Sequence, residues 1–471
     1  MFLSTQSIRK LAAFVFILAV YLPALSQAQL PADVTGQIDK LVTDTLTRTG
    51  VPSASIAVVK EGRILYVKTY GDAKLEPKTP STTQMRYSIG SISKQFTAAA
   101  ILLLQEQGKL SLDDKVAKYI PDLTRANEVT IRQLLSHTSG YQDYWPQDYV
   151  MKPMLEPITA RKIMETWAKK PLDFEPGTKW QYSNTGYTIA GAIVEKVAGV
   201  PFFEFLQQNI FKPLNMTSVM SVDKGRLPES DPVGYLRYAL GPLRVAPKEG
   251  TGWLFAAGEL AMTAEDLAKW DISIIDRKLL KPSSYLALGT ETLLKDGLGT
   301  NYGLGVTVGS PGGRRALSHG GGVSGFTTSN IVFPDDRVAV VALTNLDSGG
   351  ASGPIANGIP PLLFVANDAV TNAKLEQAKK IFEGLQQGKI DRSLFTDNAN
   401  GYFSEQALED FKNSLGPLGK WDSFTQTSQS LRGGMTGRVY LVRFRDKTIR
   451  AWTYEMSDGK LEQFQVAVVG T

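Results

Sequence analysis

A serine and a lysine stand three residues apart in the stretch YSIGSISKQF, at positions 91 and 94. At the start of a helix, this spacing puts the Ser91 hydroxyl and the Lys94 amine on one face. The helix N-terminus would favour negative charge nearby, and burial would lower the pKa of Lys94 so that it serves as a base. The alternative is an ordinary helix start with a solvated lysine. Because Ser-x-x-Lys also occurs at Ser7–Lys10 and Ser221–Lys224, the spacing alone does not decide.

Two further stretches carry polar groups of the right kind. WQYSNTGY contains Tyr182 and Asn184, a phenol that can relay a proton and an amide that can hold a carbonyl or amide group. The alternative is an ordinary loop before a helix predicted over 187–198. ALSHGGGVSGF places His319, Gly320 and Gly321 at the predicted end of a strand, where glycines let a substrate backbone approach closely. The alternative there is a turn between two strands.

The elements around these stretches alternate between strands and helices. Residues 53–71 predict a β-hairpin with its turn at Glu61–Gly62, and residues 90–290 carry mostly helical patterns. From residue 301 onward, strand patterns return as an antiparallel meander. Strands at both ends of a helical insertion predict one mixed α/β domain whose end segments build a single sheet.

A second unit is predicted over residues 371–471. Two helical patterns precede three predicted strands, at 439–445, 448–455 and 461–469, which indicates a small α+β domain. It resembles the domains related to nuclear transport factor 2 (NTF2-like) by pattern alone. Its role, whether covering the site, assembly or ligand binding, stays open. We expect five aromatic residues in its core: Phe403, Phe411, Trp421, Trp452 and Tyr454.

Composition excludes several kinds of protein. The 471 residues include no cysteine, which rules out disulfides and thiol catalysis, and only two histidines, which argues against a histidine-rich zinc site. A net charge of +5 without a basic run argues against nucleic-acid binding. Residues 1–28 predict a cleaved signal peptide, with Arg9 and Lys10 before an apolar stretch and small residues at the cleavage site. We therefore expect a periplasmic or secreted protein with no stable membrane anchor after cleavage.

Taken in order, Ser-x-x-Lys, Tyr-x-Asn and His-x-Gly resemble the motifs of the penicillin-binding-protein-like serine hydrolases. That superfamily includes class C β-lactamases, D-amino-acid-specific peptidases and family VIII carboxylesterases. The resemblance covers roughly residues 33–367, including LLSHTSG at 134–140 and AAGELAMTAEDLAKW at 256–270. For residues 29–367 it implies an antiparallel sheet flanked by helices with a helical insertion. The Ser221–Lys224 pair is not followed by the partner motifs in this order.

The resemblance implies a role for each matching residue. Ser91 would attack a carbonyl and form an acyl-enzyme, and Lys94 would take or share its proton. Tyr182 would assist proton transfer to the leaving group and later from water, while Asn184 would contact the acyl side chain. Whether Lys94 or Tyr182 is the acylation base stays open, because such a pair titrates together. No metal or cofactor is implied.

The third motif would bind substrate through His319, Gly320, Gly321 and Gly322, and the N–H groups of Ser91 and Gly322 would form the oxyanion hole. Many β-lactamases and transpeptidases of this superfamily carry Lys-Thr-Gly here, whose ammonium meets a substrate carboxylate. A histidine is only partly charged near neutral pH, which weakens the case for efficient β-lactam hydrolysis. His137, the other histidine, has no Gly-x-Ser-x-Gly elbow to accompany it, and we interpret it as structural.

These features predict an exported serine hydrolase of small acyl or peptide substrates that cleaves an ester or amide bond. A β-lactamase or D-alanyl-D-alanine carboxypeptidase is the alternative within the same chemistry. A non-catalytic protein that binds the cell wall, in contact with peptidoglycan, is the alternative outside it. The substrate itself would depend on loop shapes, such as those at 142–157 and 228–253.

Overall fold

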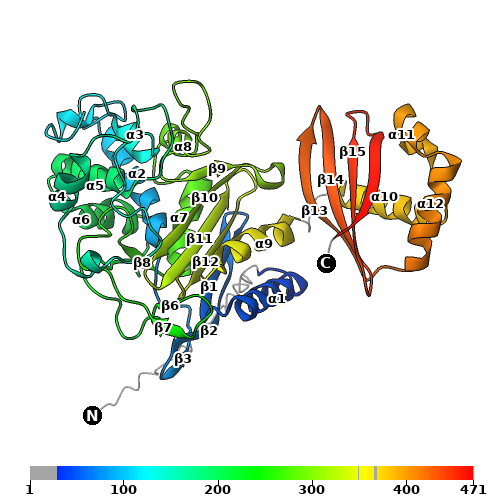
Figure 1. Cartoon of the computed structure of the whole chain (residues 1–471), viewed down its shortest axis with the longest axis horizontal. Helices are drawn as coiled ribbons and strands as arrows, with labels where there is room; N and C mark the ends of the chain where they lie inside the picture. Colours follow the sequence, from blue (N-terminus) through cyan, green and yellow to red (C-terminus); the bar gives the residue numbers. More distant parts are fainter. Residues whose placement is uncertain (1–28, 348, 365–368, 470–471) are drawn as a thin grey trace, which may run out of the picture.

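One seven-stranded antiparallel sheet joins the two ends of the larger unit of the chain (Figure 1). The structure is a computed structural model that describes residues 29–347, 349–364 and 369–469; the predicted signal peptide, residues 1–28, lies outside them. In spatial order the strands are β3 (Lys78–Pro80), β2 (Arg63–Leu75), β1 (Ser53–Lys60), β12 (Val338–Thr344), β11 (Phe326–Phe333), β10 (Ala316–Val323) and β9 (Thr307–Gly309).

The central pair of strands confirms that the two end segments build one sheet. Strand β1 pairs with β12 in a register that sets Ala54 opposite Thr344. Strand β1 is buried on both faces, so its sequence reads as an almost continuous apolar run. Alternate side chains enter two cores, with Ala57 and Val59 on one face and Ile56 and Val58 on the other.

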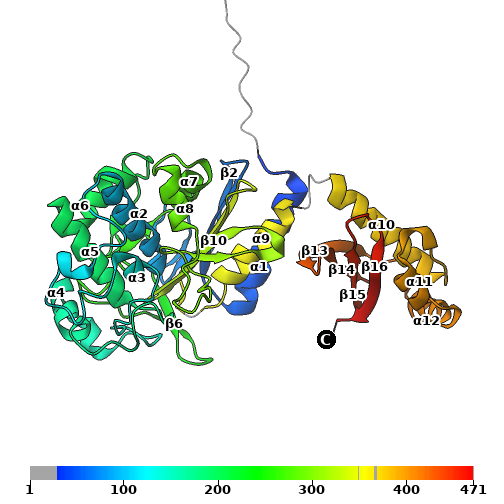
Figure 2. The same ribbon diagram turned by 90° about the horizontal axis from the view of Figure 1, so that it is seen from above.

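Helices cover both faces of this sheet (Figure 2). Helices α1 and α9 pack together on one face. Helix α7 packs on the other face, against β1 and β12. Helix α2 is buried along most of its length, because nearly every residue from Ser93 to Leu104 faces protein. The helices of this unit are α1 (Ala32–Thr49), α2 (Ser93–Glu106), α3 (Ile131–Leu135), α4 (Ala160–Ile163), α5 (Asn184–Ala198), α6 (Phe202–Leu206), α7 (Ala264–Asp276), α8 (Pro282–Leu288) and α9 (Ser352–Phe364).

Short strands tie the helical region to the segment before α2. Strand β8 (Leu260–Met262) lies between β4 (Tyr87–Ser88) and β5 (Met220–Ser221), and β6 (Tyr235–Arg237) pairs with β7 (Leu243–Val245). Among the described residues, no helix is both long and apolar enough to cross a bilayer.

The C-terminal unit packs three helices against a four-stranded antiparallel sheet. The helices are α10 (Ala369–Gln386), α11 (Asp397–Tyr402) and α12 (Glu405–Leu415), and the strands, in order, are β13 (Ser423–Arg432), β14 (Met435–Arg443), β15 (Thr448–Glu455) and β16 (Leu461–Val468). The prediction of three strands was incomplete, because β13 is mostly Ser, Thr and Gln and gives a weak strand signal. The NTF2-like resemblance stays a prediction.

Two of the expected core aromatics lie elsewhere. Phe403 is fully buried in the C-terminal core, with Phe411 and Trp421 packed against it. Trp452 and Tyr454 are half-buried on alternate positions of β15, outside that core. Each ring lies beside an arginine guanidinium, so the prediction that these two belong to the core was wrong.

Candidate active site

Ser91 sits in a 3-10 turn, Gly90–Ile92, that leads directly into α2. The β4–β8 pairing and an Ile89 N–H···Leu260 O bond of 2.9 Å hold this turn against the helical region. The Ser91 side chain is half-buried, whereas the residues that follow it in α2 are buried. The turn therefore presents one hydroxyl at the edge of a rigid helix.

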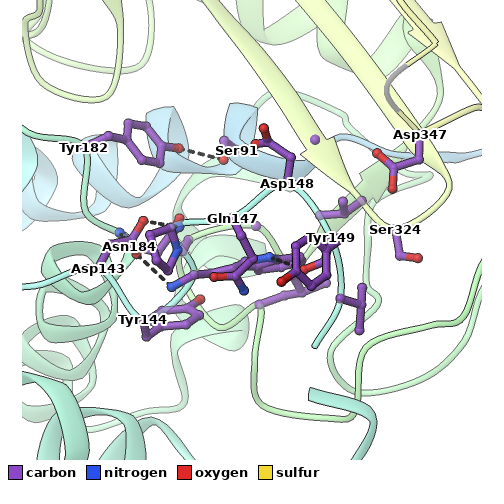
Figure 3. A pocket seen from close by; sticks show the side chains of 18 of the residues that line it. Ser91, Asp143, Tyr144, Gln147, Asp148, Tyr149, Tyr182, Asn184, Ser324 and Asp347 are labelled. Carbon is purple, nitrogen blue, oxygen red and sulfur yellow. Dashed lines mark hydrogen bonds between the residues drawn. The ribbon is translucent and has the colours of Figure 1, made fainter. Parts of the chain in front are cut away.

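Two side chains converge on the Ser91 hydroxyl, and Figure 3 shows one of them, Tyr182. The Tyr182 hydroxyl donates to Ser91 Oγ at 2.7 Å, and Lys94 Nζ lies 3.0 Å from the same oxygen. This is the arrangement of a nucleophile beside a base. The structure therefore brings Ser91 and Lys94 together with Tyr182, which lies 91 positions after Ser91 in the chain.

Lys94 is completely buried, and polar groups surround its amine. Nζ donates to Asn184 Oδ1 and to the carbonyl oxygen of Ala257, each at 2.8 Å. The rings of Tyr182 and Tyr187 lie 4.8 and 5.3 Å from it. Burial lowers the pKa of Lys94 to about 7, while the Asp143 carboxylate acts in the opposite direction. The prediction that burial lowers this pKa is confirmed.

Tyr182 is held as a neutral phenol. Burial raises its pKa above the usual value of 10.0, so near neutral pH it acts as a hydrogen-bond donor. The His137 ring lies beneath it, with ring centroids 4.3 Å apart. His137 Nδ1 accepts the Ser183 N–H at 3.1 Å, and burial lowers the pKa of His137, so the imidazole is neutral. His137 supports Tyr182 and makes no hydrogen bond to Ser91 among those found in the described residues.

His319 lies within strand β10, and so do the glycines that follow it, instead of at the end of a strand or in a turn. Its ring is buried, with Nε2 2.8 Å from the Tyr302 hydroxyl and Nδ1 2.5 Å from the Gly320 carbonyl oxygen. Burial, followed by the charge of Lys94, lowers the pKa of His319 to about 4. The expectation of a partly charged imidazole near neutral pH was therefore wrong.

The glycine run of β10 allows the strand to touch the turn that carries Ser91. A Cβ on Gly321 would lie 1.9 Å from the Ile89 carbonyl oxygen. A Cβ on Gly90, whose φ is +52°, would lie 2.8 Å from the Gly322 nitrogen. Only glycine fits at these two positions, and the resulting contact brings Gly322 to the same cavity as Ser91.

Ser91 opens into a cavity of about 600 Å³. Tyr182, Asn184 and Gly322 also line it, whereas His319, Gly320 and Gly321 are not among the described lining residues. Its charged lining residues are Asp143, Asp148 and Asp347, and none of the described residues that line it is lysine or arginine (Figure 3).

Two groups at the site escaped the sequence motifs. Asp143 and the Ala257 carbonyl contact Asn184 and Lys94, respectively. A backbone carbonyl leaves no trace in a motif, and Asp143 is one acidic residue in a loop that was expected only to shape the cavity. The available signal was the polar pair Gln142–Asp143 between two tyrosines, Tyr141 and Tyr144, which are both buried.

Among the described residues, no group of three or more His, Asp or Glu side chains is placed to hold a metal ion. The absence of a cofactor stays a prediction.

Comparisons with known proteins agree with this geometry. The beta-lactamase family model matches residues 38–358. Penicillin-binding protein 4* of Bacillus subtilis is 30% identical over 307 residues, which cover 62% of this chain and 68% of that protein. Protein flp of Staphylococcus aureus is 28% identical over 366 residues, covering 74% and 68%.

Solved structures extend the likeness in the fold. The octameric penicillin-binding protein homologue from Pyrococcus abyssi aligns with a TM-score of 0.63 over 93% of this chain and 96% of its own, at 22% identity. The D-stereospecific amidohydrolase from a Streptomyces species aligns with a TM-score of 0.60 at 26% identity, over 68% of this chain and 96% of its own. The match over more than half of the chain, with a serine, a buried lysine and a tyrosine in contact, leads to one conclusion. The chain belongs to the beta-lactamase family and is a serine hydrolase of the superfamily that includes the penicillin-binding proteins.

Proposed function

We propose that this protein hydrolyses an ester or amide bond through an acyl-enzyme formed on Ser91. One observation carries the proposal: Ser91 Oγ lies between the Tyr182 hydroxyl at 2.7 Å and Lys94 Nζ at 3.0 Å, and burial lowers the pKa of Lys94 to about 7. A lysine with that pKa is largely unprotonated just above neutral pH and accepts the serine proton as the carbonyl is attacked.

In this scheme Lys94 is the base of acylation and Tyr182 is a donor. The phenol keeps its proton in the free enzyme, because burial raises its pKa. The proton that Lys94 takes then passes by way of Tyr182 to the leaving group. Water attacks the acyl-enzyme with the proton flow reversed, which regenerates Ser91.

The N–H groups of Ser91 and Gly322 are proposed to bind the oxyanion. Both residues line the cavity, and the close contact between Gly90 and Gly322 supports this role. Each such donor typically contributes about 10²–10³-fold to the rate.

The lining of the cavity favours substrates without a carboxylate beside the scissile bond. His319 is neutral, and none of the lysines or arginines in the described chain lines the cavity, whereas three aspartates do. A β-lactam or a D-alanyl-D-alanine peptide brings a carboxylate with no cation to meet it. Neutral esters and amides, including amides of D-amino acids, fit this charge pattern better.

Mass spectrometry with p-nitrophenyl butyrate and, separately, with a labelled penicillin tests the proposal. We expect ester turnover in the native protein, a 10⁴-fold or greater loss of turnover in Ser91→Ala, of the order found when a catalytic nucleophile is removed, and little labelling by penicillin. The absence of both adduct and turnover with a broad set of esters and amides would favour a non-catalytic binding protein.

Export forms the second part of the proposal. The charged start, apolar stretch and small residues of positions 1–28 support cleavage by a signal peptidase. Sequencing the N-terminus of the protein recovered from outside the cytoplasm tests this, and a retained Met1 would contradict it.

A further inference from the structure

The loop that follows Gly140 places a carboxylate against Asn184, at the wall of the cavity. Asp143 is flanked by two buried tyrosines that anchor the loop, since Tyr141 donates to the Thr124 carbonyl oxygen at 2.9 Å and Tyr144 donates to the Trp253 carbonyl oxygen. With both tyrosines fixed, the loop holds the Asp143 carboxylate in a defined position. It does not contact Ser91.

The Asp143 carboxylate accepts three hydrogen bonds. Oδ1 accepts the backbone N–H of Asn184 at 3.0 Å and that of Trp145 at 3.2 Å. Oδ2 accepts from the side-chain Nδ2 of Asn184 at 3.3 Å. Burial raises the pKa of Asp143, while its hydrogen bonds and the charge of Lys94 oppose that shift. In its ionised form the carboxylate only accepts hydrogen bonds, so it selects the amino end of the Asn184 amide. The carbonyl end, Oδ1, must then face the other way, and it meets Lys94 Nζ at 2.8 Å.

That orientation decides where the lone pair of Lys94 lies. An unprotonated amine has two N–H bonds and one lone pair. Asn184 Oδ1 and the Ala257 carbonyl oxygen are both acceptors, so they take the two N–H bonds. The remaining position around Nζ faces Ser91 Oγ, so the lone pair is aimed at the hydroxyl proton.

We propose that Asp143 is a positioning residue: its carboxylate fixes the Asn184 amide so that the amine of Lys94 directs its lone pair at Ser91. The proposal rests on the proposed function only in taking Ser91 as the nucleophile. Asp143 lines the cavity, but in this role it acts through Asn184 and contacts none of the reacting atoms.

The carboxylate also acts on Lys94 through its charge. The other titratable groups around the amine are Tyr182, Tyr187, His137 and His319, and the environment of each keeps it neutral near pH 7. Asp143 is the one charge in the described residues that raises the pKa of Lys94 against the effect of burial. Moving this charge therefore moves the titration of the base.

Two variants separate positioning from general structural support. Asp143→Asn removes the charge and sets one amide against another, because its amino group would face the amino end of Asn184. We expect kcat to fall roughly ten- to a hundredfold, the effect of a mispaired buried polar group. The Lys94 titration, and with it the acid limb of kcat/KM, should move about one pH unit lower.

The double variant Asp143→Asn/Asn184→Asp restores the pairing with the charge exchanged. The carboxylate at position 184 would accept from the new amide and from Lys94, while the amide oxygen at position 143 would accept the two backbone N–H groups. The negative charge then lies next to Nζ, so the Lys94 titration should move above that of the native protein. The two variants are expected to shift the limb in opposite directions.

An NMR titration of the Lys94 side chain in lysine-labelled protein measures the shift whether or not the variants turn over. The pH profile of p-nitrophenyl butyrate hydrolysis provides the kinetic readout. Asp114→Asn is the matched control, since Asp114 accepts from Tyr119 at 2.6 Å and from the Ser111 N–H at 2.8 Å but does not line the cavity.

Opposite shifts of Lys94 in the two variants, with the control unchanged, support the proposal. The proposal is overturned if Lys94 titrates in both variants as it does in the native protein, or if its titration moves in the same direction in both. If no ester or amide is hydrolysed by the native protein but the opposite shifts are seen, the proposed function fails and the positioning role stands.

Discussion

Replacing Gly321 with alanine should open the contact between β10 and the turn that carries Ser91. The added Cβ would lie 1.9 Å from the Ile89 carbonyl oxygen and 2.3 Å from Thr328 Oγ1. Ordinary van der Waals contact begins at 3.4 Å, so the strand and the turn must separate by about 1.5 Å. The Ile89 N–H donates to Leu260 O on β8 and the Ile89 carbonyl oxygen accepts from Thr328 Oγ1 at 2.9 Å, so this backbone has little freedom to yield.

Two effects follow from that separation. Overpacking typically costs about 1–3 kcal/mol of folding free energy. A displacement of about 1 Å at a catalytic site can cost about 10²-fold in rate, because the nucleophile and the oxyanion donors lose their alignment. We therefore expect Gly321→Ala to lose at least a hundredfold in kcat while Tm falls by several degrees.

Gly309→Ala is the matched control. Gly309 lies in β9 of the same sheet, and a Cβ there would come no closer than 4.0 Å to another atom, on Pro311. The assay is hydrolysis of p-nitrophenyl butyrate together with thermal unfolding of both variants. If Gly321→Ala keeps kcat within threefold of the native value, the close approach of β10 to Ser91 is not what aligns the site, and the reasoning fails.

Two further predictions concern the donor at the site and a buried acid beyond it. Tyr182→Phe keeps the ring against His137 but removes the hydrogen bond to Ser91. We expect kcat to fall about 10²-fold with Tm unchanged. A fall of less than threefold would show that the phenol is dispensable. Asp271 is fully buried beside Asn330, and burial raises its pKa, so the folded protein keeps a proton that the unfolded chain releases above about pH 4. The stability that the protonated Asp271 carboxyl contributes is present at low pH and lost as pH rises. Asp271→Asn should therefore raise Tm at pH 8 but not at pH 4. An equal change in Tm at the two pH values would contradict the argument.

Much of the site could be predicted because its motifs are local. Ser91 and Lys94 lie on one helical turn, so their contact follows from spacing once a helix is expected there. Tyr182 and Asn184 flank the start of α5, where Ser183 caps the helix. What spacing does not provide is the meeting of these segments, which depends on tertiary packing, and for that the resemblance in motif order was needed.

The rest depended on burial and on contacts distant in sequence. The charge state of His319 follows from the burial of its ring, which its neighbours in sequence do not indicate. Asp143 acts through Asn184, a residue 41 positions away, and a single aspartate in a loop carries no periodic signal. Strand β13 was missed for a related reason, because polar residues fill it and only its neighbour β14 makes it a strand.

The pairing of β1 with β12 has a consequence for when activity can appear. The two strands that close the large sheet are about 290 residues apart, so a chain emerging from the ribosome contains Ser91 long before its sheet can form. Gly322 lies on β10, the third strand on the far side of that pairing, and lines the same cavity as Ser91. Long-range closure of this kind is slow compared with helix formation. The nascent chain therefore contains Ser91 well before it contains Gly322 and the strand β10 that completes the cavity.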